Sequence, residues 1–230
     1  MGYPFLISFS GLDGSGKTQL IFLLRRFLRR QGISFLYIHS ISDSFANRIA
    51  KRIPSFRRII RPKETVVTSN QEKPAPPKMK KTISFRSYAI RIFFLFIDAL
   101  YLRLRLFYFG NNYSVIIFDR YIYDKLINLA YLRRKKRLLY SNFWIRMFPR
   151  PNLPLFLHIT PEDSFARKQE VALEGQDMEY FMLKYMLFEE AKVGWKLVNI
   201  DNSALSISEA KKKILSLFKK RFYRYIRNVK

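Results

Sequence analysis

The sequence contains no cysteine and only two histidines, His39 and His158, among its 230 residues. Without cysteine the chain can form neither a disulfide framework nor a thiolate metal site. Two histidines are too few for a metal centre built on several imidazole ligands. An apolar core must therefore stabilise the fold, and the 49% of apolar residues are enough to exclude a wholly disordered chain.

Long uncharged apolar runs are also missing. The most apolar helical segment, 90–109, is interrupted by Arg91, Asp98, Arg103 and Arg105, whereas a membrane-spanning helix needs about 18 residues with few or no charges. The amino terminus has neither the basic start nor the small-residue cleavage site of a signal peptide. Together with the lack of cysteine, these features predict a cytoplasmic protein.

Acidic residues are scarce: 17 Asp and Glu stand against 43 Lys and Arg, which gives a formal net charge of +26. Basic residues also interleave with aromatic ones in the tail, from Phe222 to Arg227. Such a charge attracts polyanions, so nucleic acid or an anionic membrane surface is a candidate partner. The alternative is a solvated surface oversupplied with Lys and Arg, because charge alone indicates association without specificity.

Short apolar runs alternate with helical patterns along the chain. The runs are rich in β-branched and aromatic residues and predict strands at 5–9, 33–38, 115–118, 155–159 and 197–200. Apolar residues at helical spacing predict helices at 16–31, 84–109, 123–137, 161–172, 176–194 and 207–225. Strands that alternate with helices form parallel sheets covered on both faces. We therefore expect one three-layer α/β domain over residues 1–230, with a five-stranded parallel sheet.

One stretch, 61–81, does not fit this alternation. It contains Pro62, Pro74, Pro76 and Pro77, has no aromatic residue, and is otherwise mostly polar. We interpret it as a flexible insertion or a lid-like loop.

The most specific motif is GLDGSGKT, which follows the first predicted strand and opens the first predicted helix. It matches G-x-x-x-x-G-K-[ST], in which glycines let backbone N–H groups surround a phosphate at the positive end of a helix. Lys17 can reach the β- and γ-phosphates, and the Thr18 hydroxyl can complete the shell of Mg²⁺. A chance glycine turn is disfavoured by the strand before it and the helix after it. The residues predicted to bind ATP are Gly11, Leu12, Asp13, Gly14, Ser15, Gly16, Lys17 and Thr18.

Asp119 and Arg120 follow the third predicted strand. A carboxylate at the carboxyl end of a buried parallel strand lies where such sheets bind ligands, so Asp119 could hold Mg²⁺ or orient an acceptor. Arg120 could bind a phosphate through two parallel hydrogen bonds. The alternative is that Asp119 only caps the next helix.

Arg167 lies one to two turns into the helix predicted after the fourth strand. A positive group there could stabilise charge on a phosphoryl group during transfer. The alternative is an ion pair with Asp163, four residues earlier on the same helix.

Together these segments resemble the thymidylate kinase family of nucleoside monophosphate kinases, over nearly the whole chain. The similarity rests on the GLDGSGKT loop, the FDRY segment at 118–121, the run from Pro151 that ends at Arg167, and the closing strand up to Asp201. The resemblance implies a P-loop NTPase fold, ATP and Mg²⁺ as cofactors, transfer of phosphate to thymidine monophosphate (dTMP), and a homodimer.

The resemblance also assigns roles to individual residues. The Asp of the loop, here Asp13, contacts the acceptor sugar in that family, and the Asp and Arg of the DRY segment organise the metal and the acceptor phosphate. Family members without an Arg in the P-loop supply a cation from the lid; Gly14 stands at that position, which assigns the task to Arg167, with Lys168 beside it. The predicted catalytic residues are Lys17, Asp119, Arg120 and Arg167, the metal ligands Thr18 and Asp119, and the acceptor-binding residues Asp13, Asp98, Arg120 and Tyr121.

The chain departs from the family in its acceptor half. The Arg-Glu-Pro-Gly motif of the family should fall near 39–43, where the sequence reads His-Ser-Ile-Ser-Asp. The acceptor-lining helix has Ala99 where the family has Arg, and the Tyr-Gln pair is replaced around 128–129. Arg91, Asp98 and Arg105 share one face of that helix, where they either line a different acceptor pocket or form a salt-bridged stripe.

Three functions follow from these features, in this order. The first is an ATP-dependent kinase of a nucleoside monophosphate, with dTMP as the expected acceptor. The second is a kinase of a sugar or another phosphorylated acceptor, favoured by the departures in the acceptor half. The third is an ATP-binding protein that associates with nucleic acid or an anionic surface, suggested by the charge of +26.

Overall fold

The computed structural model describes residues 3–39, 85–109, 112–133, 141–169, 178–203 and 205–229. Within these ranges five strands form one parallel sheet in the order β2-β3-β1-β4-β5. They are β1 (Phe5–Gly11), β2 (Phe35–His39), β3 (Val115–Asp119), β4 (Leu153–His158) and β5 (Val198–Asp201). The predicted five-stranded parallel sheet is confirmed, and the predicted strand ends differ from these by at most two residues.

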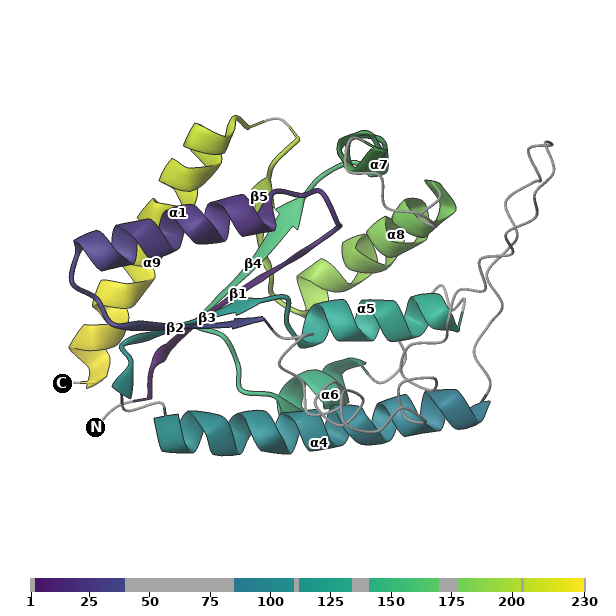
Figure 1. The fold of residues 1–230 in the computed structure, drawn as a ribbon, viewed down its shortest axis with the longest axis horizontal. Helices are drawn as coiled ribbons and strands as arrows, with labels where there is room; N and C mark the ends of the chain where they lie inside the picture. Colours follow the sequence, from purple (N-terminus) through teal and green to yellow (C-terminus); the bar gives the residue numbers. More distant parts are fainter. Residues whose placement is uncertain are drawn as a thin grey trace, which may run out of the picture.

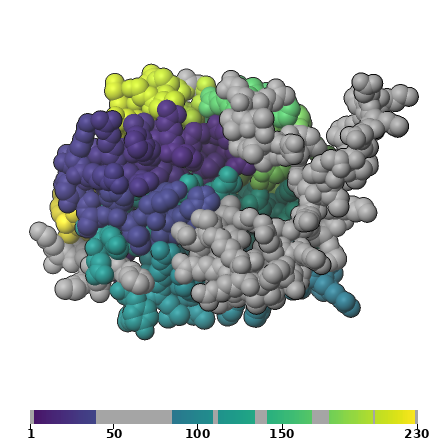
Figure 2. All heavy atoms as spheres, viewed as in Figure 1, coloured from purple at the N-terminus to yellow at the C-terminus, as the bar shows by residue number. Residues whose placement is uncertain are grey.

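Helices cover both faces of the sheet. The described helices are α1 (Lys17–Arg30), α4 (Phe85–Phe109), α5 (Ile122–Leu132), α6 (Ser141–Met147), α7 (Pro161–Gln169), α8 (Met178–Gly194) and α9 (Ile207–Val229). One face carries α1 and α9, and the other carries α4, α5, α6 and α8 (Figure 1). Figure 2 shows α1, in purple, against the start of α9, in yellow, at the surface. The three-layer α/β architecture is therefore confirmed.

Some sequence predictions lie outside the described residues. They are the insertion at 61–81, the predicted helix starts at 84 and 176, and the predicted helix ends at 137 and 172. None of the helices in the described ranges is long and apolar enough to cross a membrane, in agreement with the sequence.

Successive side chains of a strand point to opposite faces of the sheet, and each face has its own core. From β1, Phe5 and Ile7 enter the core under α1 and α9, whereas Leu6 enters the core under α4, α5 and α8. From β3, Ile117 joins the first core and Ile116 the second. Because both faces are apolar, the strands read as continuous apolar runs and not as alternating ones.

The aromatic residues of the basic tail form part of this core. Phe222 is buried on α9, with its ring 5.5 Å from that of Phe5 and 4.9 Å from that of Phe218. The ring of Tyr225 also lies 5.5 Å from that of Phe5. The side of α9 that carries Phe222 and Tyr225 therefore holds the helix to β1, so these two aromatic residues have a structural role without a nucleic-acid partner.

The centre of the sheet determines where a ligand can bind. β2 and β3 lie on one side of β1, and β4 and β5, which come later in the chain, lie on the other side. Ligands of open parallel sheets bind at the carboxyl ends of the strands, where the order of construction changes side. The loop after β1, the end of β3 and the start of α7 meet in this region (Figure 1).

Candidate functional site

The loop between β1 and α1 needs glycine at three positions. Gly11, Gly14 and Gly16 have φ angles of 145°, 86° and 80°, which residues with a Cβ rarely adopt. A Cβ on Gly11 would lie 2.5 Å from the carbonyl oxygen of Leu157, and one on Gly16 would lie 2.8 Å from Nδ2 of Asn202. The loop is thus a tight backbone turn that only glycine permits, as the motif predicts.

The helix after the loop offers its positive end. α1 begins at Lys17 directly after Gly16, with no side-chain cap and no acidic residue in its first turn. The first N–H groups of a helix have no partner within it, and they carry the positive end of the helix dipole. Thr18 is exposed in this turn. The end of the helix is therefore suited to an anion such as phosphate.

Lys17 is buried beneath the loop. Its ammonium donates to the carbonyl oxygens of Gly11 at 2.9 Å and Leu12 at 2.5 Å, and to the hydroxyl of Ser15 at 3.1 Å. Burial and the positive charge of Arg120 lower its pKa to about 8. An ammonium has three donors, so a phosphate oxygen bound by Lys17 must replace one of these protein acceptors.

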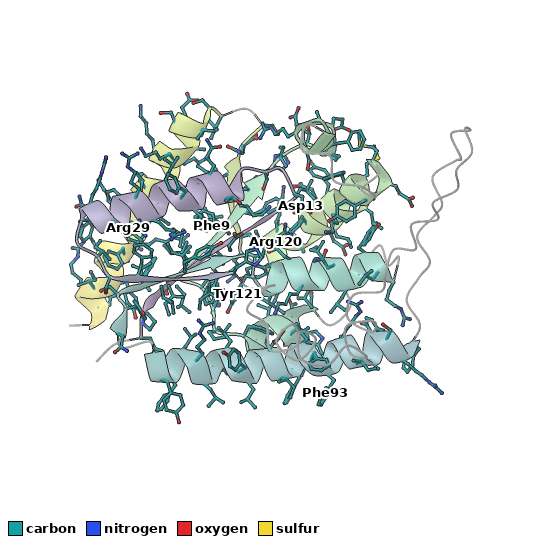
Figure 3. The ribbon with its side chains drawn as sticks, in the orientation of Figure 1. Phe9, Asp13, Arg29, Phe93, Arg120 and Tyr121 are labelled. Atoms are coloured by element: carbon teal, nitrogen blue, oxygen red, sulfur yellow. The ribbon has the colours of Figure 1, made fainter. Side chains whose placement is uncertain are left out.

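Asp13 and Arg120 form an ion pair beside the loop (Figure 3). Tyr180 of α8 donates to the other carboxylate oxygen of Asp13 at 2.9 Å, and the Ser164 hydroxyl of α7 donates to the backbone carbonyl of Asp13. Burial would raise the pKa of Asp13, but the charges of Arg120, Lys184 and Lys17 hold it well below its usual range. The neighbouring cations thus favour the charged form of Asp13, and its contacts tie the loop to the end of β3, to α7 and to α8.

The backbone of Arg120 has an unusual conformation. Its φ is 62°, in the left-handed region, and its N–H donates to the carbonyl oxygen of Phe9 at 2.9 Å. A left-handed residue with a Cβ costs about 1–2 kcal/mol. This turn ends β3 and directs the guanidinium towards Asp13 (Figure 3). Strained residues of this kind are typical of functional sites, where the surroundings hold them in place.

Asp119, at the end of β3, is buried. Its Oδ2 accepts a hydrogen bond from the Tyr37 hydroxyl at 2.8 Å and lies 4.0 Å from Nε2 of His39. The alternative role, capping the next helix, is wrong, because Tyr121 occupies the N-cap of α5. Asp124 caps this helix, since its Oδ2 accepts the N–H of Tyr121 at 3.1 Å. The carboxylate of Asp119 therefore stays at the carboxyl edge of the sheet.

Arg167 extends from α7 towards the phosphate loop. Its guanidinium donates to the carbonyl oxygens of Gly14 at 3.5 Å and Asn202 at 3.4 Å. The ion pairs of the described residues do not include one between Arg167 and Asp163. Arg167 thus places a cation on the loop, where the sequence predicts it. The side chain of Lys168 lies outside the described part of the chain.

Two residues predicted to bind the acceptor have structural partners instead. Asp98 of α4 is buried and accepts a hydrogen bond from the Lys125 ammonium of α5 at 2.8 Å. Because Lys125 lies on another helix, the pair connects α4 to α5. Tyr121 is buried among aromatic rings, and its hydroxyl donates to the carbonyl oxygen of Pro149. Burial raises the pKa of Tyr121 well above its usual value.

Tyr180 and Lys184 of α8 belong to the site, although neither is predicted from the sequence. The ammonium of Lys184 is buried, donates to the Tyr180 hydroxyl at 2.5 Å and lies 4.2 Å from the centroid of that ring. Burial lowers the pKa of Lys184 to about 8. The signal that could identify the pair is their i,i+4 spacing, which places a phenol and an ammonium on one helix face.

Asn202, just after β5, is a second residue that the sequence does not predict. Its Nδ2 donates to the carbonyl oxygen of Ser15 at 2.8 Å, and its backbone N–H donates to the carbonyl oxygen of His158 at 2.9 Å. Its Oδ1 is buried and has no hydrogen-bond partner among the described residues. Asn202 therefore supports the loop from below, next to Gly16.

Comparison with models of protein families finds no match for this chain, and a search of curated proteins finds no matching sequence. The resemblance to thymidylate kinases therefore remains a prediction.

Proposed function

We propose that the protein is an ATP- and Mg²⁺-dependent phosphotransferase of the P-loop kind. The observation that carries this proposal is the glycine loop that joins the central strand β1 to α1. Gly11, Gly14 and Gly16 hold it in conformations that other residues rarely adopt, and Lys17 lies beneath it. An exposed helix end, a buried ammonium and the guanidinium of Arg167 converge there. This is the arrangement that binds polyphosphates in P-loop proteins.

The residues present fit the phosphate donor. The N–H groups at the start of α1 would bind phosphate oxygens, and the Lys17 ammonium would exchange one of its acceptors in the loop for a phosphate oxygen. Thr18 and Asp119 would hold Mg²⁺, which often uses one or two protein oxygens together with phosphate and water. When bound, the ion neutralises charge between the β- and γ-phosphates.

Transfer breaks the bond between the γ-phosphorus and the bridging oxygen and forms a bond to an acceptor oxygen. It needs no covalent intermediate on the protein, so positioning and charge stabilisation account for catalysis. Arg167, on the loop, would stabilise the equatorial oxygens during transfer. Arg120 would bind the acceptor phosphate, held in place by its pair with Asp13.

The acceptor expected from the resemblance is dTMP. A different phosphorylated or sugar acceptor is the second candidate, and the contacts of the acceptor-side residues favour it. Asp13 is engaged by Arg120 and Tyr180, Asp98 is paired with Lys125, and Tyr121 is buried against Pro149. All four predicted acceptor ligands therefore have protein partners, since Arg120 is the partner of Asp13.

The decisive experiment is an acceptor screen monitored by ADP release. Purified protein with Mg-ATP is offered dTMP, dUMP, the other nucleoside monophosphates, and a set of sugars and sugar phosphates. We expect acceptor-dependent ADP release that Lys17→Ala abolishes and Lys220→Ala, a change at an exposed residue of α9, leaves intact. Transfer to dTMP selects the first candidate, and transfer to a non-nucleotide selects the second. No transfer to any acceptor, together with no binding of ATP, would refute the proposal.

A further inference from the structure

The outward face of α4 is apolar along its whole length. Six of its exposed large side chains are 48% to 74% accessible and recur on one side of the helix. They are Phe85, Phe93, Phe96, Leu100, Leu104 and Phe107. Phe93 projects from the side of α4 that faces away from the sheet (Figure 3). We call these six residues the α4 stripe; at 1.5 Å per residue it is about 33 Å long.

The stripe is additional to the face that α4 packs against the sheet. Leu95, Ala99 and Leu106 of the same helix are buried in the core under α4, α5 and α8. Rotating α4 to bury the stripe would expose these core residues. The helix is therefore apolar on two sides, and contiguous exposed patches of this kind mark interaction surfaces.

Arginines border the stripe, and no exposed acid accompanies them on α4 or α6. Arg86 and Arg103 are exposed on α4, and Arg146 is exposed on α6. Arg103 donates to the carbonyl oxygens of Met147 at 2.8 Å and Arg146 at 3.2 Å, which holds α6 beside α4. The only acid in either helix is Asp98, which is buried. The surface thus combines aromatic and aliphatic side chains with positive charge alone.

A cavity of about 340 Å³ lies beside the carboxyl-terminal part of α4. Its lining includes Arg103 and Arg150 together with Asn152 and Tyr225, and it contains no acidic residue. The two carbonyl contacts of Arg103 use two of its five N–H donors. A positively charged cavity next to an apolar stripe can receive an anionic group at the edge of an apolar surface.

The positive charge around the α4 stripe indicates which of two partners, a second copy of the chain or a membrane, fits it better. A second copy of this chain would bring arginine-bordered surfaces together, with a net charge of +26 on each copy, and like charges in contact oppose association. An anionic lipid surface instead attracts the arginines and accepts the aromatic side chains below its headgroups. Basic residues beside Phe and Leu are the pattern of helices that lie in a membrane interface.

We propose that the α4 stripe and its arginines, with the adjoining cavity, dock the protein on anionic membrane surfaces. In this arrangement α4 lies in the plane of the interface, with its stripe among the upper acyl chains. Arg103 and Arg150 face the phosphate groups of the lipids. The proposal does not depend on the proposed kinase activity, since none of its residues belongs to the phosphate loop.

Vesicle co-sedimentation tests this surface. The full chain is mixed with vesicles of phosphatidylcholine alone and of phosphatidylcholine with phosphatidylglycerol, at about 0.15 M salt. We expect binding to the anionic vesicles and little to the neutral ones. The double variant Phe93→Ser/Leu100→Ser should bind about tenfold more weakly or worse, because two apolar side chains no longer enter the interface. Arg150→Gln should weaken binding to anionic vesicles about threefold to fivefold.

The matched control is Phe22→Ser/Tyr223→Ser, which removes exposed rings of similar accessibility, 59% and 54%, from α1 and α9. It should bind vesicles like the unmodified protein, and all variants should keep the same circular dichroism and a cooperative thermal unfolding transition. Equal binding by the stripe variant and the unmodified protein would overturn the proposal, because charge alone would then explain it. The proposal would also fail if the unmodified protein did not bind vesicles but formed a dimer in sedimentation velocity, and the stripe variant stayed monomeric. The stripe would then be the contact with a second copy.

Discussion

Four glycine-to-alanine substitutions, two in the phosphate loop and two outside it, should separate the effects of backbone strain and of steric contact on the free energy of unfolding. Gly194, at the end of α8, has an ordinary φ and open space around an added Cβ. Gly32 also has open space, but its φ is 63°. Gly194→Ala should therefore stabilise the protein by about 0.4–1 kcal/mol through the unfolded state. Gly32→Ala should destabilise it by about 1 kcal/mol, the strain of a left-handed residue.

The two loop glycines add contact to this strain. A Cβ on Gly16, at φ 80°, meets the side-chain Nδ2 of Asn202 at 2.8 Å, so Asn202 must move and weaken its hydrogen bond to Ser15. The backbone strain and the weakened hydrogen bond together predict that Gly16→Ala lowers the free energy of unfolding by roughly 2–3 kcal/mol. On Gly11 the Cβ meets the backbone oxygen of Leu157 at 2.5 Å, and a backbone in the centre of the sheet cannot move aside. Gly11→Ala should therefore lose more than roughly 3 kcal/mol.

Thermal unfolding measures the series, since 1 kcal/mol corresponds to about 2–4 °C in Tm for a chain of this size. We expect Tm to fall in the order Gly194→Ala, Gly32→Ala, Gly16→Ala and Gly11→Ala. Asn202→Ala combined with Gly16→Ala should recover part of the Gly16→Ala loss, because it removes the group that the Cβ meets. A Gly16→Ala protein as stable as Gly32→Ala would show that Asn202 does not lie against the loop, and the reasoning would fail.

Three further substitutions test the charged groups around the loop. Burial lowers the pKa of Lys184 from 10.5 to about 8, so between these values the unfolded chain binds more protons than the folded chain, and stability rises with pH. Lys184→Met should reduce this rise in urea unfolding across that range and leave the part due to Lys17, whose pKa is also lowered to about 8; an unchanged rise would show that Lys184 does not contribute. Arg167→Ala should lower the kcat of ADP release about tenfold or more and change Tm by less than about 2 °C; a large fall in Tm instead would make Arg167 structural. Asp13→Asn should destabilise the fold by roughly 2 kcal/mol, because the Arg120 guanidinium loses its charged partner, and an unchanged urea midpoint would contradict the pair.

The sheet and most helices could be predicted because each depends on a local pattern. The strands are apolar runs buried on both faces, and the helices have apolar residues at the spacing of one turn. Among the described helices, the one that escapes prediction is α6, which has seven residues and none that is fully buried. Its apolar residues pack against the core only in part, and two turns are too short to give a periodic pattern in the sequence. The start of β4 at Leu153 also escapes, because Pro154 within the strand reads as an interruption.

Part of the candidate site could likewise be predicted from the sequence, and part could not. The glycine loop, Lys17 and Thr18 are contiguous, and a motif detects them. The partners of Asp13 are distant in sequence, since Arg120 lies 107 residues away and Tyr180 lies 167 residues away. Only the folded sheet and the packing of α8 bring them together. No local pattern shows that Asp13 is already paired, and its role as an acceptor ligand comes from the resemblance to thymidylate kinases alone.

This pairing bears directly on the choice of acceptor. Arg120 has five N–H donors, so it can bind Asp13 and still present others to an acceptor phosphate. Asp13 has less freedom, because its two carboxylate oxygens accept from Arg120 and Tyr180, and Lys184 lies behind Tyr180. An acceptor that needed Asp13 for its sugar hydroxyl would have to displace the partly buried phenol of Tyr180 or an ion pair. An acceptor that needs only the Arg120 cation displaces neither. The geometry therefore favours recognition through the acceptor's phosphate over recognition through its sugar.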